Sequence, residues 1–330
     1  MATVRDVALL AGVSPATVSR VLNGRTVVSP EARTRVLAAV KELDFQPNTM
    51  AQGLRLGRGT SVALLVGDIE QGVYSALTRH IQEALAELGL DLLLYNLAHS
   101  EERLLRILER APSLRLRGVI IATADVIPIA ALQAVALGRS GIVVLSVGQR
   151  LHRHGITSIV HGERAAVAQS VGYLIEQGRT PIAYVGRIAE SVTGSDRFGG
   201  YKAALARAGL AVDRNLVWDV AYRYNAGYEA LSRALDAGIV IGGVQAGSDE
   251  LALGAVAAIR DRNLRVPEDI AVIGLGDIEL GAHARPALTT LSAHPKLIAE
   301  KVRQIIGAGE SRKVPALSVI PRKLILRQSA

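Results

Sequence analysis

A short stretch near the start of the chain carries polar side chains at a spacing that suits contact with DNA bases. Ser19, Arg20 and Asn23 fall on one face of a predicted helix, together with Pro15 and Ala16. Arginine can donate two hydrogen bonds to a guanine edge, while serine, asparagine and small apolar groups suit other base edges and phosphates. The opposite face carries valine and leucine, which would be buried. The pattern predicts a helix that presents its polar face to a major groove.

Three short helices within residues 1–46 would position this face. Thr3 predicts the N-cap of the first helix, and Gly12, which tolerates a left-handed turn, predicts its end. Ser14 and Ser29, each followed by proline, predict the N-caps of the second and third helices. The buried face of the third helix is expected at Ala32, Val36, Leu37, Val40 and Leu43. The same spacing also fits an ordinary helical hairpin with a solvated polar face.

A fourth short helix is predicted in the segment over residues 47–60. Pro47-Asn48 would end the third helix, and Asn48 can cap residues 49–56. So short a helix is unstable in water alone, and Gly53 in its middle costs a further 0.5–1 kcal/mol, roughly, relative to alanine. We therefore expect this segment to be helical only against DNA and a second copy of itself.

Beyond residue 60 the pattern changes to alternating apolar strands and amphipathic helices. Strands are predicted at residues 61–66, 90–97, 118–122 and 142–147, and then at 156–160, 181–186, 243–246 and 270–274. The helices between them are predicted at residues 74–88, 101–111 and 129–137, and then at 165–177, 197–208, 226–237 and 250–262. Two consecutive βαβ series predict an α/β core of two parallel-sheet lobes, with a ligand cleft at the carboxyl ends of the strands.

Composition and charge narrow the class of protein. The chain has no cysteine, which excludes disulfides and thiolate metal sites and fits a reducing compartment. It has neither an apolar run of about 18 residues nor a secretion signal, so we expect a cytoplasmic protein without a membrane partner. Residues 1–60 hold eight Lys or Arg against four Asp or Glu, whereas the rest of the chain holds thirty against twenty-six. The denser positive charge of the N-terminal part favours contact with phosphates.

At this point the chain resembles the LacI-type family of bacterial transcriptional regulators. The resemblance is carried by Thr3–Ala8, Ala11–Ser14, Thr17–Asn23, Pro47-Asn48 with Ala51 and Leu54, Val266–Gly274 and Pro286–Thr290. It implies a helix-turn-helix domain over residues 1–46, a hinge helix and linker over 47–60, and a periplasmic-binding-protein-like core over 61–330. The first lobe of that core is expected at about 61–155 plus 293–318, and the second lobe at about 156–290 plus 319–330.

The resemblance also implies partners and site residues. The protein would act as a homodimer on a near-palindromic operator, most simply as a repressor, under the control of a small-molecule effector. DNA contacts are expected at Thr3, Val4, Arg5, Ser14, Pro15, Ala16, Thr17, Ser19, Arg20, Asn23, Ser29, Asn48, Ala51 and Leu54. Effector contacts are expected at Asp68, Gln71, Arg197, Tyr222, Ser248 and Asp277.

Several departures from the family pattern point to an unusual effector. Ser248, Gly276, Ala293 and the His161-Gly162 pair stand where the family has asparagine, aspartate or glutamine. A sugar in such a pocket would leave hydroxyls unpaired, at a cost of about 1–3 kcal/mol each. We therefore doubt a simple pentose or hexose and expect a different or larger ligand, sugar-like but atypical at most, or no ligand.

Other function classes find little support in the sequence. Gly274-Leu275-Gly276 lacks the third glycine of a dinucleotide fingerprint, because position 279 is glutamate. The close pair His152 and His154 has no acidic or thiol neighbour, so neither a catalytic site, a metal site nor a cofactor is predicted. The alternative is a cytoplasmic small-molecule-binding protein of the solute-binding fold without DNA activity, which would have no use for residues 1–58.

Overall fold

The computed structural model divides the chain into two compact units, residues 1–60 and 61–330. It describes residues 2–22, 28–45, 59–138, 141–309 and 314–330. Each unit has a hydrophobic core of its own, one small core in the first unit and four larger clusters in the second. The fold class predicted from the sequence, a helix-turn-helix unit followed by a two-lobed α/β core, is confirmed.

The first unit consists of three helices, as the capping residues predict. They are α1 (Val4–Ala11), α2 (Pro15–Leu22) and α3 (Pro30–Glu42). Thr3 forms the predicted capping box with Asp6, and Gly12 ends α1 in the left-handed conformation with φ of 62°. The small core contains Val7, Ala8, Ala11, Val18, Val21, Val36, Ala39 and Phe45. The expectation for Leu37 is wrong: its side chain is 52% exposed, and Ala39 takes the buried position instead.

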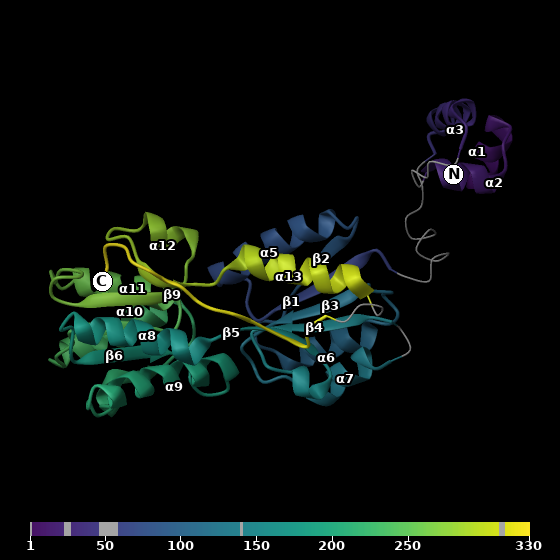
Figure 1. Ribbon diagram of the computed structural model, residues 1–330. Helices are drawn as coiled ribbons and strands as arrows, with labels where there is room; N and C mark the ends of the chain where they lie inside the picture. Colours follow the sequence, from purple (N-terminus) through teal and green to yellow (C-terminus); the bar gives the residue numbers. More distant parts are fainter. Residues whose placement is uncertain (1, 23–27, 46–58, 139–140, 310–313) are drawn as a thin grey trace. The chain divides into compact units, whose positions relative to one another are not determined.

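The first lobe of the second unit is a six-stranded sheet whose neighbouring strands are all parallel. In order across the sheet the strands are β11 (Leu317–Ile320), β5 (Thr157–His161), β4 (Val143–Val147), β3 (Gly118–Ala122), β1 (Ser61–Val66) and β2 (Asp91–Asn96). One face is covered by α5 (Gly72–Ala86) and α13 (Pro295–Ala308), and the other by α6 (Glu101–Arg110) and α7 (Ile129–Ala136) (Figure 1). The inner strands β1, β3 and β4 are covered on both faces and are almost continuously apolar, whereas the edge strand β2 is largely exposed.

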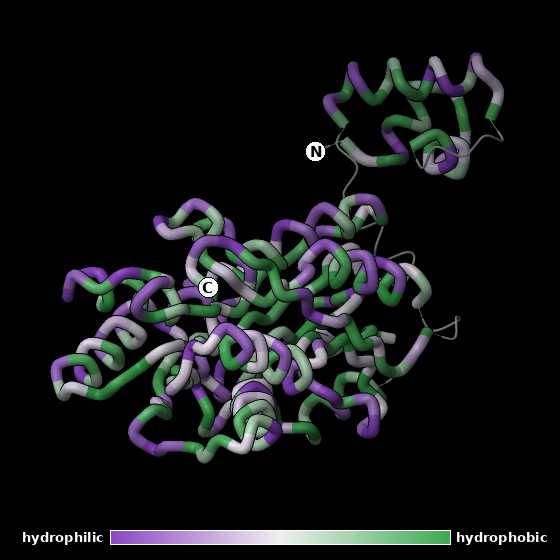
Figure 2. The backbone as a smooth tube through the Cα atoms, turned by 60° about the vertical axis from the view of Figure 1, so that its left-hand side comes forward, coloured by the Kyte–Doolittle hydropathy of each residue, from purple (hydrophilic) through white to green (hydrophobic). Residues whose placement is uncertain are grey.

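The second lobe is also a six-stranded sheet covered on both faces. Its strands are β12 (Leu324–Ile325), β10 (Thr289–Ser292), β9 (Ala271–Gly276), β8 (Gly243–Ala246), β6 (Ile182–Gly186) and β7 (Val217–Asp219). Only β12 is antiparallel to its neighbour. One face packs against α10 (Tyr224–Asp236) and α11 (Asp249–Arg260), and the other against α8 (Glu163–Glu176) and α9 (Val192–Arg207). In Figure 2 the segments through the middle of the core are predominantly hydrophobic, whereas the outer helices alternate in hydropathy.

The chain passes between the two lobes three times, and two of these passages correct the lobe boundaries expected from the sequence. The crossings lie between β5 and α8, between β10 and α13, and between β11 and β12. Residues 157–161 and 319–320 were expected in the second lobe, but they pair within the first sheet. Parallel pairing joins strands that are distant in sequence, so local periodicity does not reveal which sheet a strand enters. The expected return of the chain to the first lobe after residue 293 agrees with the packing of α13 in the core of that lobe.

Several short elements of the two lobes were not anticipated. These are β7, β10, α12 (Glu279–His283) and the two 3₁₀ turns at His152–His154 and Arg214–Leu216. Helix α9 begins at Val192, where the Ser191 hydroxyl accepts a hydrogen bond from the Gly194 amide. Arg197 was expected at the start of this helix, but it lies in the second turn.

No helix within the described ranges is both long and apolar enough to cross a membrane.

Candidate functional site

The outward face of α2 is the candidate DNA-binding surface. Pro15, Ala16 and Arg20 are exposed on it, while Val18 and Val21 on the opposite face are buried in the core of the unit. The residue types and spacing that the sequence placed on this face are therefore presented to solvent on a fixed helix. Thr17 and Ser19 are half-buried at its margin.

The hydroxyl groups that were expected to contact DNA also cap the N-termini of the helices. The Ser14 hydroxyl accepts a hydrogen bond from the Thr17 amide at 3.1 Å, and the Ser29 hydroxyl accepts one from Ala32 at 3.3 Å. Thr3 caps α1 in the same way, with Arg5 exposed and Val4 half-buried just after it. Such caps fix where each helix begins, so these residues position the face of α2 whatever else they contact. Asn23, Asn48, Ala51 and Leu54 lie outside the described residues.

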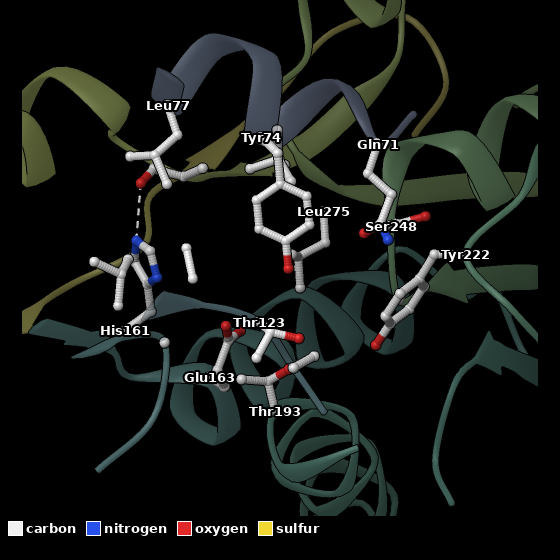
Figure 3. Close-up of a pocket in the computed structure, with 18 of the residues that line it drawn as sticks. Gln71, Tyr74, Leu77, Thr123, His161, Glu163, Thr193, Tyr222, Ser248 and Leu275 are labelled. Carbon is white, nitrogen blue, oxygen red and sulfur yellow. Dashed lines mark hydrogen bonds between the residues drawn. The ribbon is translucent and has the colours of Figure 1, made fainter. Parts of the chain in front are cut away.

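The candidate effector site is a cavity between the two lobes at the carboxyl ends of their strands (Figure 3). Its volume is about 90 Å³, well below the roughly 300–1,000 Å³ of sites that hold drug-sized ligands. The first lobe contributes Gln71, Val73, Tyr74, Leu77, His99, Ala122, Thr123, Ala124, Val147, Gly148, Pro295 and Ile298. The second lobe and the crossings contribute His161, Glu163, Thr193, Arg197, Tyr222, Gly247, Ser248, Glu250, Leu275, Gly276, Ala293 and Arg322. Only a small ligand fits while the lobes are this close, so the cavity in this arrangement does not accommodate the larger ligand that the sequence analysis allowed.

Arg197 reaches the cavity from α9 and is held by the protein on three sides. Its Nε and Nη2 donate to the two carboxylate oxygens of Glu163 at 3.2 and 3.0 Å. Its Nη1 donates to the carbonyl of Gly247 at 2.9 Å and to the hydroxyl of Tyr222 at 3.2 Å. The guanidinium is therefore fixed in a single orientation at the wall of the cavity.

Glu163 connects Arg197 to the crossings between the lobes. Arg322, in the crossing from β11 to β12, donates from Nε and Nη2 to the same carboxylate at 2.9 and 2.8 Å and from Nη1 to the carbonyl of Ser292 at 3.0 Å. Burial alone would raise the pKa of Glu163, but the charges of Arg197 and Arg322 hold it well below its usual range. The carboxylate is thus permanently ionised between two guanidinium groups.

His161, the last residue of β5, is hydrogen-bonded to the crossing between β10 and α13. Its Nε2 donates to the carbonyl of Ala293 at 2.8 Å (Figure 3). Burial, and then the positive charge of Arg322, lower the pKa of His161 to about 4. The imidazole is therefore neutral near pH 7, with its proton on Nε2.

Charged pairs join the lobes beside the cavity. Asp68, after β1, accepts a hydrogen bond from Arg223 of the second lobe at 2.6 Å. Asp125, after β3, pairs with Arg187 of the second lobe and lies 2.9 Å from Nδ1 of His99. Burial raises the pKa of Asp125, but hydrogen bonds from His99, Thr123 and Arg187 outweigh it and lower the value below the ordinary range. These pairs hold the lobes together at the edge of the cleft.

The structure brings together four of the six residues expected to contact the effector. Gln71, Arg197, Tyr222 and Ser248 line the cavity, and Ser248 also caps α11. Asp68 lies in the cleft but is taken up by its ion pair with Arg223. Asp277 pairs with Arg327 at 2.6 Å and is not among the residues that line the cavity.

Sequence reasoning predicted Arg197 but missed Glu163 and Arg322, its partners in the central ion triplet. Glu163 is the first residue of α8, where an acidic side chain ordinarily complements the helix dipole in solvent. Arg322 lies in a polar stretch between two short strands, which resembles a surface loop. Thr193 and Tyr74 were missed as well, and no local pattern distinguishes them from packing residues. Among the described residues, no three His, Asp or Glu side chains gather closely enough to hold a metal ion.

The fold and the cavity define a protein that combines a helix-turn-helix unit with a two-lobed binding core. Residues 3–48 match the family model of bacterial regulatory proteins, lacI family, and residues 171–330 match a periplasmic binding protein-like domain. Catabolite control protein A of Priestia megaterium is 31% identical over 290 residues, covering 88% of this chain and 86% of the relative. The regulator AscG of Escherichia coli is 31% identical over 313 residues, covering 93% and 90%.

Solved structures agree over nearly the whole chain. The lac repressor dimer bound to operator and the anti-inducer ONPF has a TM-score of 0.88 at 25% identity, covering 99% of this chain and 98% of the other. The CelR–cellobiose complex has a TM-score of 0.72 at 28% identity and covers all of both chains. This chain belongs to the lacI family of bacterial regulatory proteins, and it is a DNA-binding transcriptional regulator.

Proposed function

We propose that this regulator is a repressor that binds a near-palindromic operator as a homodimer, and that a small molecule in the interlobe cavity controls its affinity. The observation that carries the proposal is the exposed face of α2, with Arg20, Ala16 and Pro15 outward and two valines inward. The lac repressor structure, in which a dimer is bound to operator, supports the mode of binding. The CelR structure, a complex with cellobiose, supports a ligand-binding core.

The roles of the recognition residues follow from their chemistry. The guanidinium of Arg20 suits the edge of a guanine, and the apolar surfaces of Pro15 and Ala16 suit a thymine methyl group. Thr3, Ser14, Thr17 and Ser29 fit contacts to the phosphate backbone, which fix the register without reading the sequence. Leu54 would enter the minor groove at the operator centre together with its symmetry mate.

The control of DNA affinity would act through lobe closure. Four residues expected to contact the effector face a cavity whose walls belong to both lobes. A ligand with different affinity for the open and closed lobes must shift the balance between them. If the two copies of the segment over residues 49–56 pair only at one lobe spacing, that shift changes operator affinity.

We also propose that the protein catalyses no reaction and acts in the cytoplasm. The relatives are transcriptional regulators, which supports the first statement. A repressor must reach chromosomal DNA, which supports the second.

Selection of bound fragments from genomic DNA, followed by fluorescence anisotropy with a recovered fragment, tests the function. Arg20→Ala should weaken operator binding about 5- to 150-fold, because a lost guanine contact costs roughly 1–3 kcal/mol. The matched control is Arg106→Ala, which removes a solvent-exposed arginine of α6, in the unit of residues 61–330. A full-length protein that binds no genomic fragment at low salt, with or without cell metabolites, contradicts the proposal.

A further inference from the structure

The hydrogen-bonding capacity of Arg197 is almost fully used within the protein. A guanidinium has five N–H donors, and four of those of Arg197 are engaged by Glu163, Gly247 and Tyr222. The edge that would hold a carboxylate or phosphate in two parallel hydrogen bonds is occupied by Glu163. One donor on Nη2 remains for a ligand.

Glu163 cannot readily give up this position. Its two oxygens accept four N–H groups, two from Arg197 and two from Arg322, which fills the lone-pair positions of a carboxylate. Arg322 is also anchored to the carbonyl of Ser292, so Glu163 is held where the crossings between the lobes run. An acidic ligand that displaced it would leave a buried charge unpaired, which is strongly unfavourable.

The remaining lining shows no excess of positive charge for an acidic ligand. The cavity is lined by two guanidinium groups and two carboxylates, and the second carboxylate, Glu250, accepts a hydrogen bond from the Gly72 amide at 2.8 Å. The imidazole of His99 also lines the cavity, and its Nδ1 lies 2.9 Å from the carboxylate of Asp125. His161 is neutral near pH 7, as described above. A charged molecule would lose its hydration on entering this space without gaining a compensating partner.

One polar group in the cavity does lack a partner. Thr193 is 6% exposed, and its hydroxyl oxygen is buried without a hydrogen-bond partner among the described residues. Figure 3 shows Thr193 near Glu163 and Thr123, with the ring of Tyr74 reaching down from α5 above them. A buried hydroxyl left unpaired costs about 1–3 kcal/mol, so a ligand that bonds to it recovers this energy. Much of the surrounding wall is apolar, including Leu77, Leu275 and Ile298.

We propose that Glu163 is a built-in anion that excludes acidic ligands, and that the effector is a small uncharged molecule with an apolar body and a hydrogen-bonding group for Thr193. This inference rests on the proposed function, since it specifies the ligand of the same cavity. Glu163 thereby determines the specificity of the site for ligand charge.

Equilibrium dialysis of the full-length protein against a bacterial small-molecule extract tests the ligand class. The extract is first separated by anion and cation exchange into anionic, cationic and uncharged fractions, and Thr193→Val serves as the matched control of nearly the same shape. We expect the wild-type protein to enrich a compound from the uncharged fraction at least about tenfold over Thr193→Val. Enrichment from a charged fraction, equal enrichment by both proteins, or enrichment from no fraction overturns the proposal.

Isothermal titration calorimetry with lactate tests the role of Glu163 directly. Glu163→Gln keeps the size of the side chain but removes its charge, so lactate should bind this variant at least about tenfold more tightly than the wild type. Glu102→Gln, which removes an exposed carboxylate of α6, should leave the wild-type value unchanged. Tight binding of lactate by the wild type contradicts the proposal even if Glu163→Gln fails to fold.

Operator binding by the same preparations separates the two claims. If the protein binds operator and also an acidic effector, the proposed function stands and this inference is wrong. If the protein binds no operator, the proposed function is wrong.

Discussion

His161 shows how a single side chain links the cavity to the stability of the molecule. Its imidazole is neutral in the folded protein, because burial and the charge of Arg322 lower its pKa to about 4 from the ordinary 6.5. The unfolded chain therefore takes up a proton at higher pH than the folded chain does. Between pH 6.5 and pH 4 the free energy of unfolding contributed by this residue must fall as the pH is lowered.

We predict that His161→Gln flattens this pH dependence. The glutamine amide can still donate to the carbonyl of Ala293 but does not titrate, so the variant should lose less stability than the wild type between pH 6.5 and pH 4. The difference should be of the order of 2 kcal/mol, after allowance for the partly exposed ring. Denaturant unfolding of both proteins at several pH values measures it. Parallel pH profiles for the two proteins would show that the imidazole does not titrate as described.

At the residue scale, sequence reasoning succeeded where the chemistry is local. The caps at Thr3, Ser14 and Ser29 depend on side chains that bond to amides three residues away, so the sequence alone predicts them. The pairing of Glu163 with Arg322 joins residues 159 positions apart. No local pattern encodes such a contact, and a charged residue in isolation is expected to be solvated.

At the scale of elements, the cleft is held by ion pairs between loops of opposite lobes. Asp68 with Arg223, and Asp125 with Arg187, each join the end of a first-lobe strand to the second lobe. Partly exposed pairs of this kind contribute about 0.2–1 kcal/mol each. Neither pair alone would hold the lobes, but together they favour the closed arrangement.

Removing both pairs should open the cleft. We predict that the double variant Arg187→Gln/Arg223→Gln has a larger radius of gyration than the wild type in small-angle X-ray scattering of the core, residues 59–330. Arg262→Gln, which breaks a pair with Asp236 inside the second lobe, should leave the radius unchanged. An unaltered radius in the double variant would mean that packing, and not charge, keeps the lobes closed.

The segment over residues 49–56 lies outside the described residues, and its role as a hinge helix stays a prediction. Leu54→Ala should weaken operator binding at least about tenfold, because an apolar wedge that unstacks a base step contributes a few kcal/mol through DNA bending. Fluorescence anisotropy measures the operator affinity, and circular dichroism of the same protein checks that the core remains folded. Unchanged affinity in a folded variant would refute the wedge.

Elements with strong periodicity were also the ones that the sequence located well. The expected ranges for β1 and β3 match the structure to the residue. The short strands β7 and β10 were missed, although β8, which also has four residues, was located to the residue. Sheet membership of β5 and β11 was wrong because it depends on which distant strand lies alongside.

At the scale of the whole molecule, we expect the unit of residues 1–60 to bind operator and the unit of residues 61–330 to bind the ligand. We predict that deletion of residues 1–58 abolishes operator binding while the remaining core folds and retains its ligand. Anisotropy measures the first effect, and dialysis against the uncharged metabolite fraction measures the second. If the truncated protein still bound operator, the assignment of DNA recognition to the N-terminal unit would be wrong.

The three passages between the lobes have a consequence for synthesis on the ribosome. The first sheet needs β11 at its edge and α13 on its face, yet these elements are translated after nearly all of the second lobe. At about 5–20 residues per second, the strands from β1 to β5 wait for many seconds before their last partners emerge. During that time the apolar surface that will meet α13 is uncovered, so the nascent first lobe should depend on chaperones more than the second lobe does.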